Sequence, residues 1–128
     1  DKDSHGLVLL TNDGDLTQKL AHPRYEVSKE YEVTIDQDID LSSRLLSGVD
    51  IGEDDGIARA SQVIYLGHRK YRLILSQGKK RQIKRMFRVL GANVLDLKRV
   101  RLSNLNLGTL PLGQWRYLEA GEIKKLAR

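Results

Sequence analysis

Positive side chains are concentrated in one short stretch of the sequence, and side chains of this kind bind phosphates. Within residues 79–88, six of ten consecutive positions are basic and none is acidic: Lys79, Lys80, Arg81, Lys84, Arg85 and Arg88. Most charge runs are solvated helix faces, but such faces normally include acids, because opposite charges four residues apart relieve repulsion. An all-basic run therefore favours contact with the phosphates of a nucleic acid.

A second basic segment follows along the chain and carries Lys98, Arg99 and Arg101. Lys and Arg together number 22 against 17 Asp and Glu, so the net charge is +5. This balance favours a polyanionic partner over an acidic or neutral one. Residue types alone thus predict a basic domain that binds RNA or DNA.

The first basic run must be positioned by a helix. Ile83, Met86, Phe87 and Leu90 recur at the spacing of one helical face, which predicts an amphipathic helix over residues 78–91. Gly78 opens this segment, and the first backbone NH groups of a helix can also receive an anion. Which basic side chains face outward stays open at this point, since one of Arg81 or Arg85 could instead buttress the core.

Strands are predicted on both sides of this helix. In residues 29–35, Tyr31, Val33 and Ile35 alternate with polar residues, as in a strand with one buried face. By this pattern alone, Tyr31 is first an ordinary core residue. Further strands are predicted over the apolar or alternating segments 6–11, 57–66, 71–75 and 94–102, with 57–66 and 71–75 forming a hairpin.

Helices complete the predicted architecture. Short helices are expected over residues 15–22 and 41–46, and a last one from Glu119. Trp115 lies in a leucine-rich stretch, where a tryptophan is most often a core anchor. The 128 residues contain no linker-like segment, so we expect one α+β domain with a mostly antiparallel mixed sheet flanked by a few helices.

Several classes of protein are disfavoured. The chain has no cysteine, which excludes disulfides and thiolate chemistry. Its three histidines are scattered without ligand spacing, so no metal site is expected. Ser4 has no paired His and Asp pattern of a hydrolase. The longest apolar run, 7–10, is too short to span a bilayer. A cytoplasmic protein without a membrane partner is the plain expectation.

The order of several motifs goes further than composition. Residues 1–14 (DKDSHGLVLLTNDG) resemble the segment that follows Gly-Arg-Leu in the nucleophile motif of the ribosomal small- and large-subunit pseudouridine synthases. Segments similar to those of this family continue in the same order at 22–23 (HP), 29–33 (KEYEV), 78–87 (GKKRQIKRMF), 97–101 (LKRVR) and 108–115 (GTLPLGQW). The resemblance covers essentially the whole chain.

The resemblance implies a specific chemistry. Enzymes of this family isomerise a uridine in ribosomal RNA to pseudouridine through an aspartate carboxylate, with base flipping and without a cofactor or metal. Asp1 matches that aspartate, Lys84 the cation that keeps it ionised, and Tyr31 the tyrosine that stacks on the base. The remaining basic residues are the expected RNA contacts: Lys79, Lys80, Arg81, Arg85, Arg88, Lys98, Arg99 and Arg101.

The resemblance also implies which part of the enzyme is present. Residues 1–128 correspond to the larger, C-terminal part of the catalytic domain, and the family's N-terminal RNA-binding domain and first catalytic strands are expected to lie outside it. The sheet should then have an open edge, which a second chain or fragment could cover; the oligomeric state is not indicated. The main alternative is a non-catalytic RNA-binding module on the same scaffold. A DNA-binding regulator is disfavoured, because no helix-turn-helix spacing accompanies the basic helix.

Overall fold

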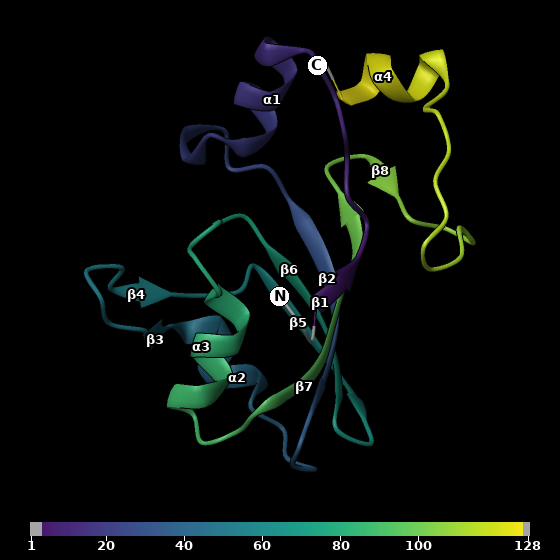
Figure 1. Cartoon of the computed structure of the whole chain (residues 1–128). Coiled ribbons are helices and arrows are strands. Elements are labelled where there is room, and N and C mark those ends of the chain that lie inside the picture. Colours follow the sequence, from purple (N-terminus) through teal and green to yellow (C-terminus); the bar gives the residue numbers. More distant parts are fainter. Residues whose placement is uncertain (1–3, 127–128) are drawn as a thin grey trace.

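A twisted mixed sheet organises the computed structural model, which describes residues 4–126 (Figure 1). Its main strands lie in the order β1-β7-β2-β6-β5, and β8 pairs with β7. Only β1 and β7 run parallel; the other pairs are antiparallel. The strands of this sheet are β1 (Ser4–Gly6), β2 (Lys29–Ile35), β5 (Gln62–Gly67), β6 (Lys70–Leu75), β7 (Val94–Leu102) and β8 (Leu105–Asn106). The predicted α+β class with a mostly antiparallel mixed sheet is confirmed.

Short helices and a small ribbon surround the sheet. The ribbon pairs β3 (Val49–Asp50) with β4 (Ile57–Ala58). The helices are α1 (Gly14–Ala21), the single 3-10 turn η1 (Pro23–Tyr25), α2 (Ser42–Ser47), α3 (Gln82–Val89) and α4 (Ala120–Leu126). In Figure 1, α2, α3 and the ribbon lie at one end of the molecule, and α1 and α4 lie at the other. Within residues 4–126, no helix has the length and apolar character needed to cross a membrane.

The core forms where α3 packs on the sheet. Ile83, Met86 and Phe87 from α3 are each at most 4% exposed, and they join Val33 and Ile35 of β2 in one apolar cluster. Phe87 also meets the ring of Tyr71 edge-on, with centroids 5.2 Å apart. The predicted apolar face of the helix is therefore its buried face.

Some predicted boundaries hold and others are corrected. The strands 29–35 and 94–102 have their predicted limits, and β5 and β6 form the predicted hairpin. The helix predicted from residue 78 begins only at Gln82, because Arg81 adopts a left-handed conformation (φ 50°) that a continuous α-helix excludes. The predicted strand 57–66 is broken in two, since residues 59–61 turn away from the β3–β4 ribbon to join β6, where the Ser61 NH bonds to the Ile74 carbonyl at 2.7 Å.

Two predicted burials are wrong. The buried strand expected at 6–11 is not formed: β1 ends at Gly6, and of the apolar residues after it Leu7 and Leu9 are half-buried while Val8 and Leu10 are 69% and 88% exposed. The reason is the lack of a pairing strand beyond that point among the described residues. Trp115, expected in the core, is 74% exposed and contacts Tyr117 edge-on at 5.3 Å. Its stretch of chain runs along the surface, so the leucines around it do not enclose the ring.

The buried contact between α3 and the sheet gives a stability prediction. Phe87→Ala should lower the free energy of unfolding by about 3–5 kcal/mol, because it leaves a cavity beside Tyr71. Val89→Ala, two residues further along the same helix and 55% exposed in the parent chain, should change it by less than about 0.5 kcal/mol. Chemical denaturation measures both, and equal effects would contradict the observed packing.

Candidate active site

A cavity of about 260 Å³ lies between the sheet and the segment that leads into α3. Tyr31 and Lys84, two of the three residues expected to be catalytic, both line it. Ser4, at the start of β1, lines it as well. Asp1 lies outside the described residues, three positions before Ser4. The structure therefore brings Tyr31 and Lys84 together, and the chain enters the described region at the same cavity.

Tyr31 is placed by strands on both of its sides. It pairs with Leu73 of β6 and with Arg99 of β7, at a point where the register between β2 and β7 shifts. Burial raises the pKa of the Tyr31 hydroxyl above its usual value of 10, against the smaller lowering effect of the nearby Arg99 guanidinium. At neutral pH this hydroxyl therefore carries its proton and can donate a hydrogen bond.

Lys84 and Gln82 are the buried polar residues of α3. Lys84 is 8% exposed and lines the cavity. Because an ammonium group is costly to bury without a compensating partner, its position in this wall favours an anionic group close by. The sequence singled out Lys84 as a site residue, and its role there stays a prediction; its burial could not be read from a basic run.

Two glutamines shape the cavity wall and were not singled out by the sequence. The Gln82 side chain accepts a hydrogen bond from the Lys79 backbone NH at 3.1 Å and donates one to Gln77 Oε1 at 3.1 Å. Gln77 Oε1 also accepts from the Arg59 backbone NH at 3.1 Å. The sequence offered one clue to this arrangement, because Gln82 is an uncharged polar residue within the basic run. Its hydrogen bonds hold the turn that precedes α3.

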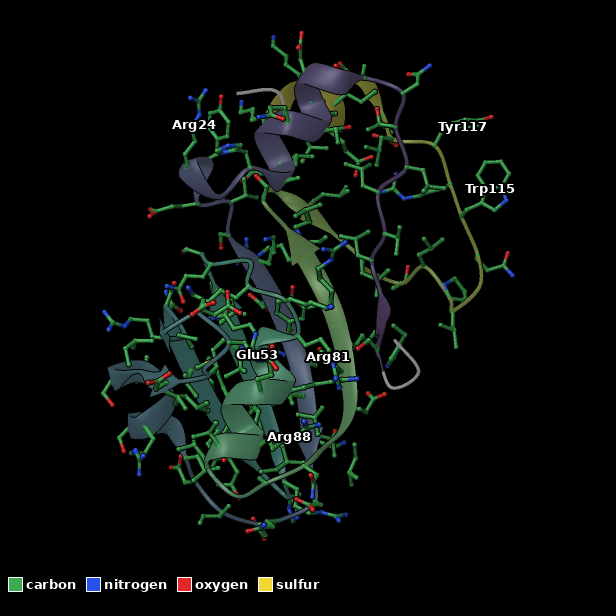
Figure 2. The ribbon with its side chains drawn as sticks, turned by 60° about the vertical axis from the view of Figure 1, so that its left-hand side comes forward. Arg24, Glu53, Arg81, Arg88, Trp115 and Tyr117 are labelled. Atoms are coloured by element: carbon green, nitrogen blue, oxygen red, sulfur yellow. The ribbon has the colours of Figure 1, made fainter. Side chains whose placement is uncertain are left out.

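The side chains of the basic run differ in their exposure. Lys80, Arg81 and Arg88 are exposed, and Arg81 also lines the cavity. Figure 2 shows Arg81 and Arg88 near opposite ends of α3. Lys79 lines the cavity too, but its ammonium group donates to the Asp55 carbonyl at 2.7 Å. Exposed cations beside a cavity suit phosphates that flank a bound base.

Arg85 has a structural task. Its side chain is 12% exposed, and it donates to the Asp55 carboxylate at 2.7 Å and to the carbonyls of Ile51 and Gly52 at 2.8 and 2.9 Å. Of the two arginines that could buttress the core, Arg85 does so by holding the loop between β3 and β4 to α3. These bonds leave its guanidinium poorly placed for the RNA contact that the sequence suggested.

The basic residues of β7 are half-buried in the sheet. Arg99 donates twice to the Leu7 carbonyl, and Arg101 donates to the Ser103 carbonyl at 2.7 Å and to Ser28 Oγ at 3.0 Å. Lys98 lies in register with His5 of β1. Arg99 and Arg101 therefore make protein contacts with the groups that would bind phosphates.

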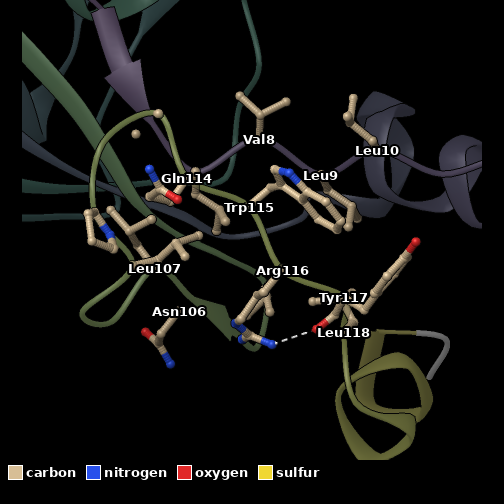
Figure 3. A pocket seen from close by; sticks show the side chains of 16 residues that line it. Val8, Leu9, Leu10, Asn106, Leu107, Gln114, Trp115, Arg116, Tyr117 and Leu118 are labelled. Carbon is tan, nitrogen blue, oxygen red and sulfur yellow. Dashed lines mark hydrogen bonds between the residues drawn. The ribbon is translucent and has the colours of Figure 1, made fainter.

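A larger hollow, of about 560 Å³, lies away from this chemistry (Figure 3). Leucines of the segments 7–10 and 105–118 form a large part of its lining, and Trp115 and Tyr117 line it as well. Its one charged lining residue, Arg116, is paired with Glu122 at 2.7 Å, and this pair holds the pKa of the Glu122 carboxyl at about 2. Because this hollow is largely apolar and its charged residue is already paired, the smaller cavity is the candidate active site.

The sequence, compared with protein families, matches the RNA pseudouridylate synthase family over residues 1–88. The match takes in Tyr31 and Lys84, and it covers more than half of the chain. The chain belongs to this family.

Relatives and a solved structure agree with this assignment. The chain is 38% identical to an uncharacterized RNA pseudouridine synthase of Aquifex aeolicus (strain VF5), with 100% of the chain and 54% of the relative covered. It is 35% identical to the ribosomal large subunit pseudouridine synthase B of Bacillus subtilis (strain 168), with 98% and 54% covered. A crystal structure of a pseudouridylate synthase superimposes with a TM-score of 0.88 at 31% identity, over 94% of this chain and 54% of that one. The chain thus spans about half the length of the proteins it matches.

The contacts of Arg85 predict a stability effect. Arg85→Gln should lower the free energy of unfolding by about 2 kcal/mol, because it leaves a half-buried carboxylate and carbonyls without their donor. Arg88→Gln, one turn further along α3 and exposed in the parent chain, should change it by less than about 0.5 kcal/mol. Denaturant titration of both variants tests this, and a stable Arg85 variant would restore that arginine as a candidate RNA contact.

Proposed function

We propose that the protein isomerises a specific uridine of ribosomal RNA to pseudouridine at the cavity lined by Tyr31 and Lys84. The observation that carries the proposal is the convergence of these two residues, from β2 and α3, on the cavity that Ser4 also lines. The Bacillus subtilis relative is by its name an enzyme of the large ribosomal subunit, which supports a ribosomal RNA substrate. Such a substrate places the enzyme in the cytoplasm.

The reaction breaks the bond from N1 of uracil to C1′ of ribose and forms a bond from C5 to the same carbon. C5 loses its hydrogen and N1 gains one, so the atoms balance without an oxidant or a co-reactant. The Asp1 carboxylate acts as a nucleophile on the ring or on C1′, or as the base that generates a glycal. In each case the carboxylate must be ionised.

The residues of the cavity supply what such a reaction requires. The Lys84 ammonium favours the ionised form of a carboxylate beside it, because an opposite charge within a few Å lowers a carboxyl pKa. The Tyr31 ring offers an apolar face on which a base can stack, and its protonated hydroxyl can donate a hydrogen bond to the base. Lys84 thus keeps the Asp1 carboxylate ionised, and Tyr31 binds the uracil base.

RNA must present the uridine outside its stack. A cavity of about 260 Å³ can take a single nucleobase, and a base within a helix reaches such a site only by flipping. The exposed cations Lys80, Arg81 and Arg88 hold the flanking phosphates, which repays part of the cost of unstacking. We therefore propose that the target uridine is flipped out of its stack to reach Tyr31.

Replacing the proposed catalytic carboxylate tests the proposal. In the intact protein, Asp1→Asn should abolish pseudouridine formation, measured by the release of tritium from RNA labelled at uridine C5. Binding of the RNA should remain, because the cations that face the phosphates are unchanged. Asp15→Asn, an exposed acid in the first turn of α1, is the matched control and should keep full activity. Retained tritium release by the Asp1 variant would exclude the proposed role.

Salt dependence separates the enzyme from a non-catalytic RNA-binding module. Arg88→Gln should weaken RNA binding and reduce the slope of log K against log salt by about 0.7–0.9, the value for one lost phosphate contact. Filter binding between low and moderate salt measures this slope for both proteins. An unchanged slope would mean that Arg88 does not contact a phosphate of the RNA. A protein that binds RNA in this way but forms no pseudouridine would be the module.

A further inference from the structure

We propose that Arg99 is a positioning residue of the active site: its guanidinium ties Tyr31 to the segment that follows Asp1. This inference rests on the proposed function, because it assigns Arg99 a task in the same reaction. It replaces the expectation that Arg99 binds a phosphate of the RNA.

The first observation is the attachment of the chain after β1. Arg99 Nε and Nη2 donate to the Leu7 carbonyl at 2.9 and 2.7 Å, and the Leu7 NH donates to the Arg99 carbonyl at 2.8 Å. One arginine thus binds both backbone groups of Leu7. β1 pairs with β7 over only three residues, from Ser4 to Gly6, so these bonds are a large share of what holds this segment.

The second observation is the close approach at Gly6. A Cβ atom at this position would lie 2.3 Å from the Arg99 carbonyl oxygen and 2.7 Å from its nitrogen, and the backbone has a φ of 106°. Only glycine allows this approach. The segment that leads from Asp1 is therefore seated directly on the backbone of Arg99 as well as on its side chain.

The third observation connects Arg99 to the base-stacking residue. Tyr31 lies opposite Arg99 in the pairing of β2 with β7. Directly opposite residues of neighbouring strands present their side chains on the same face of the sheet. Burial raises the pKa of Tyr31, and the nearby Arg99 guanidinium lowers it by a smaller amount. The same charge lowers the pKa of the half-buried Lys29, after the larger effect of burial. Arg99 thus binds the segment just after β1 and lies opposite Tyr31 in the sheet.

These contacts make Arg99 different from the exposed cations. A guanidinium has a planar fork of donors, and here two of them bind the Leu7 carbonyl from a strand position opposite Tyr31. Asp1 lies three residues before β1, so an error in the seating of β1 shifts the carboxylate relative to Tyr31. A displacement of about 1 Å in a catalytic group can cost about 100-fold in rate.

Three variants of the intact protein test the inference. Arg99→Gln removes the charge and the fork, and Arg99→Lys keeps the charge without the fork. Arg72→Gln is the matched control, because Arg72 is also a strand arginine, half-exposed and paired with Glu30 and Glu32 at 3.6 and 3.8 Å. Each variant is assayed for kcat and KM with RNA, and the Tyr31 hydroxyl is titrated by NMR of protein labelled at tyrosine Cζ.

Arg99→Gln should raise the pKa of Tyr31 and lower kcat by about 10–100-fold with KM changed less than about twofold. Arg99→Lys should restore part of kcat and keep the pKa of Tyr31 near that of the parent protein. If the glutamine variant fails to fold, the lysine variant still tests the inference. Arg72→Gln should change none of these. A rise in KM with kcat and the Tyr31 titration unchanged would make Arg99 an RNA contact and overturn the inference. The titration needs no turnover, so a parent protein without activity would refute the proposed function and leave this measurement valid.

Discussion

The structure depends on the pairing of β2 with a strand on each side. β6 and β7 bind it along nearly its whole length, and this double pairing fixes which side chains face the core. A slip of one residue would exchange the buried and polar faces of β2, so the hydrophobic pattern and the hydrogen bonds enforce one register. The fixed register of β2 determines the position of Tyr31. Val33 and Ile35 are anchored below α3, and Tyr31, two residues earlier on the same face, meets the cavity.

The second determinant is how positive charge is distributed around α3. All six basic residues of the run carry a positive charge. In the folded protein, however, their side chains have different surroundings. Arg85 is bound to the β3–β4 loop, Lys84 lines the cavity, and Lys80 and Arg88 remain exposed to solvent. The repulsion within the run is relieved where backbone carbonyls and Asp55 accept hydrogen bonds. The cations that remain exposed are the ones suited to phosphate.

Much of the fold and part of the site could be predicted from the sequence. The alternation of β2 and the helical spacing of Ile83, Met86 and Phe87 predicted the sheet and its packing helix, because burial of one face imposes those periods. The motif order pointed to Tyr31 and Lys84, which line the same cavity. The sequence left open whether Arg81 or Arg85 would buttress the core, and the bonds of Arg99 could not be predicted, since the Leu7 carbonyl is brought near it only by the fold. Asp1 lies outside the described residues, and its role stays a prediction. The remaining RNA contacts are also predictions. So is a second chain or fragment that would cover the sheet edge at β1.

The most direct test of the account is a crystal structure of the intact protein bound to an RNA that contains the target uridine. The account predicts a uridine extruded from its stack, its base against the Tyr31 ring, with the carboxylate of Asp1 and the ammonium of Lys84 at the same cavity. An RNA bound elsewhere on the protein, with an empty cavity and its uridine stacked in the RNA, would contradict it.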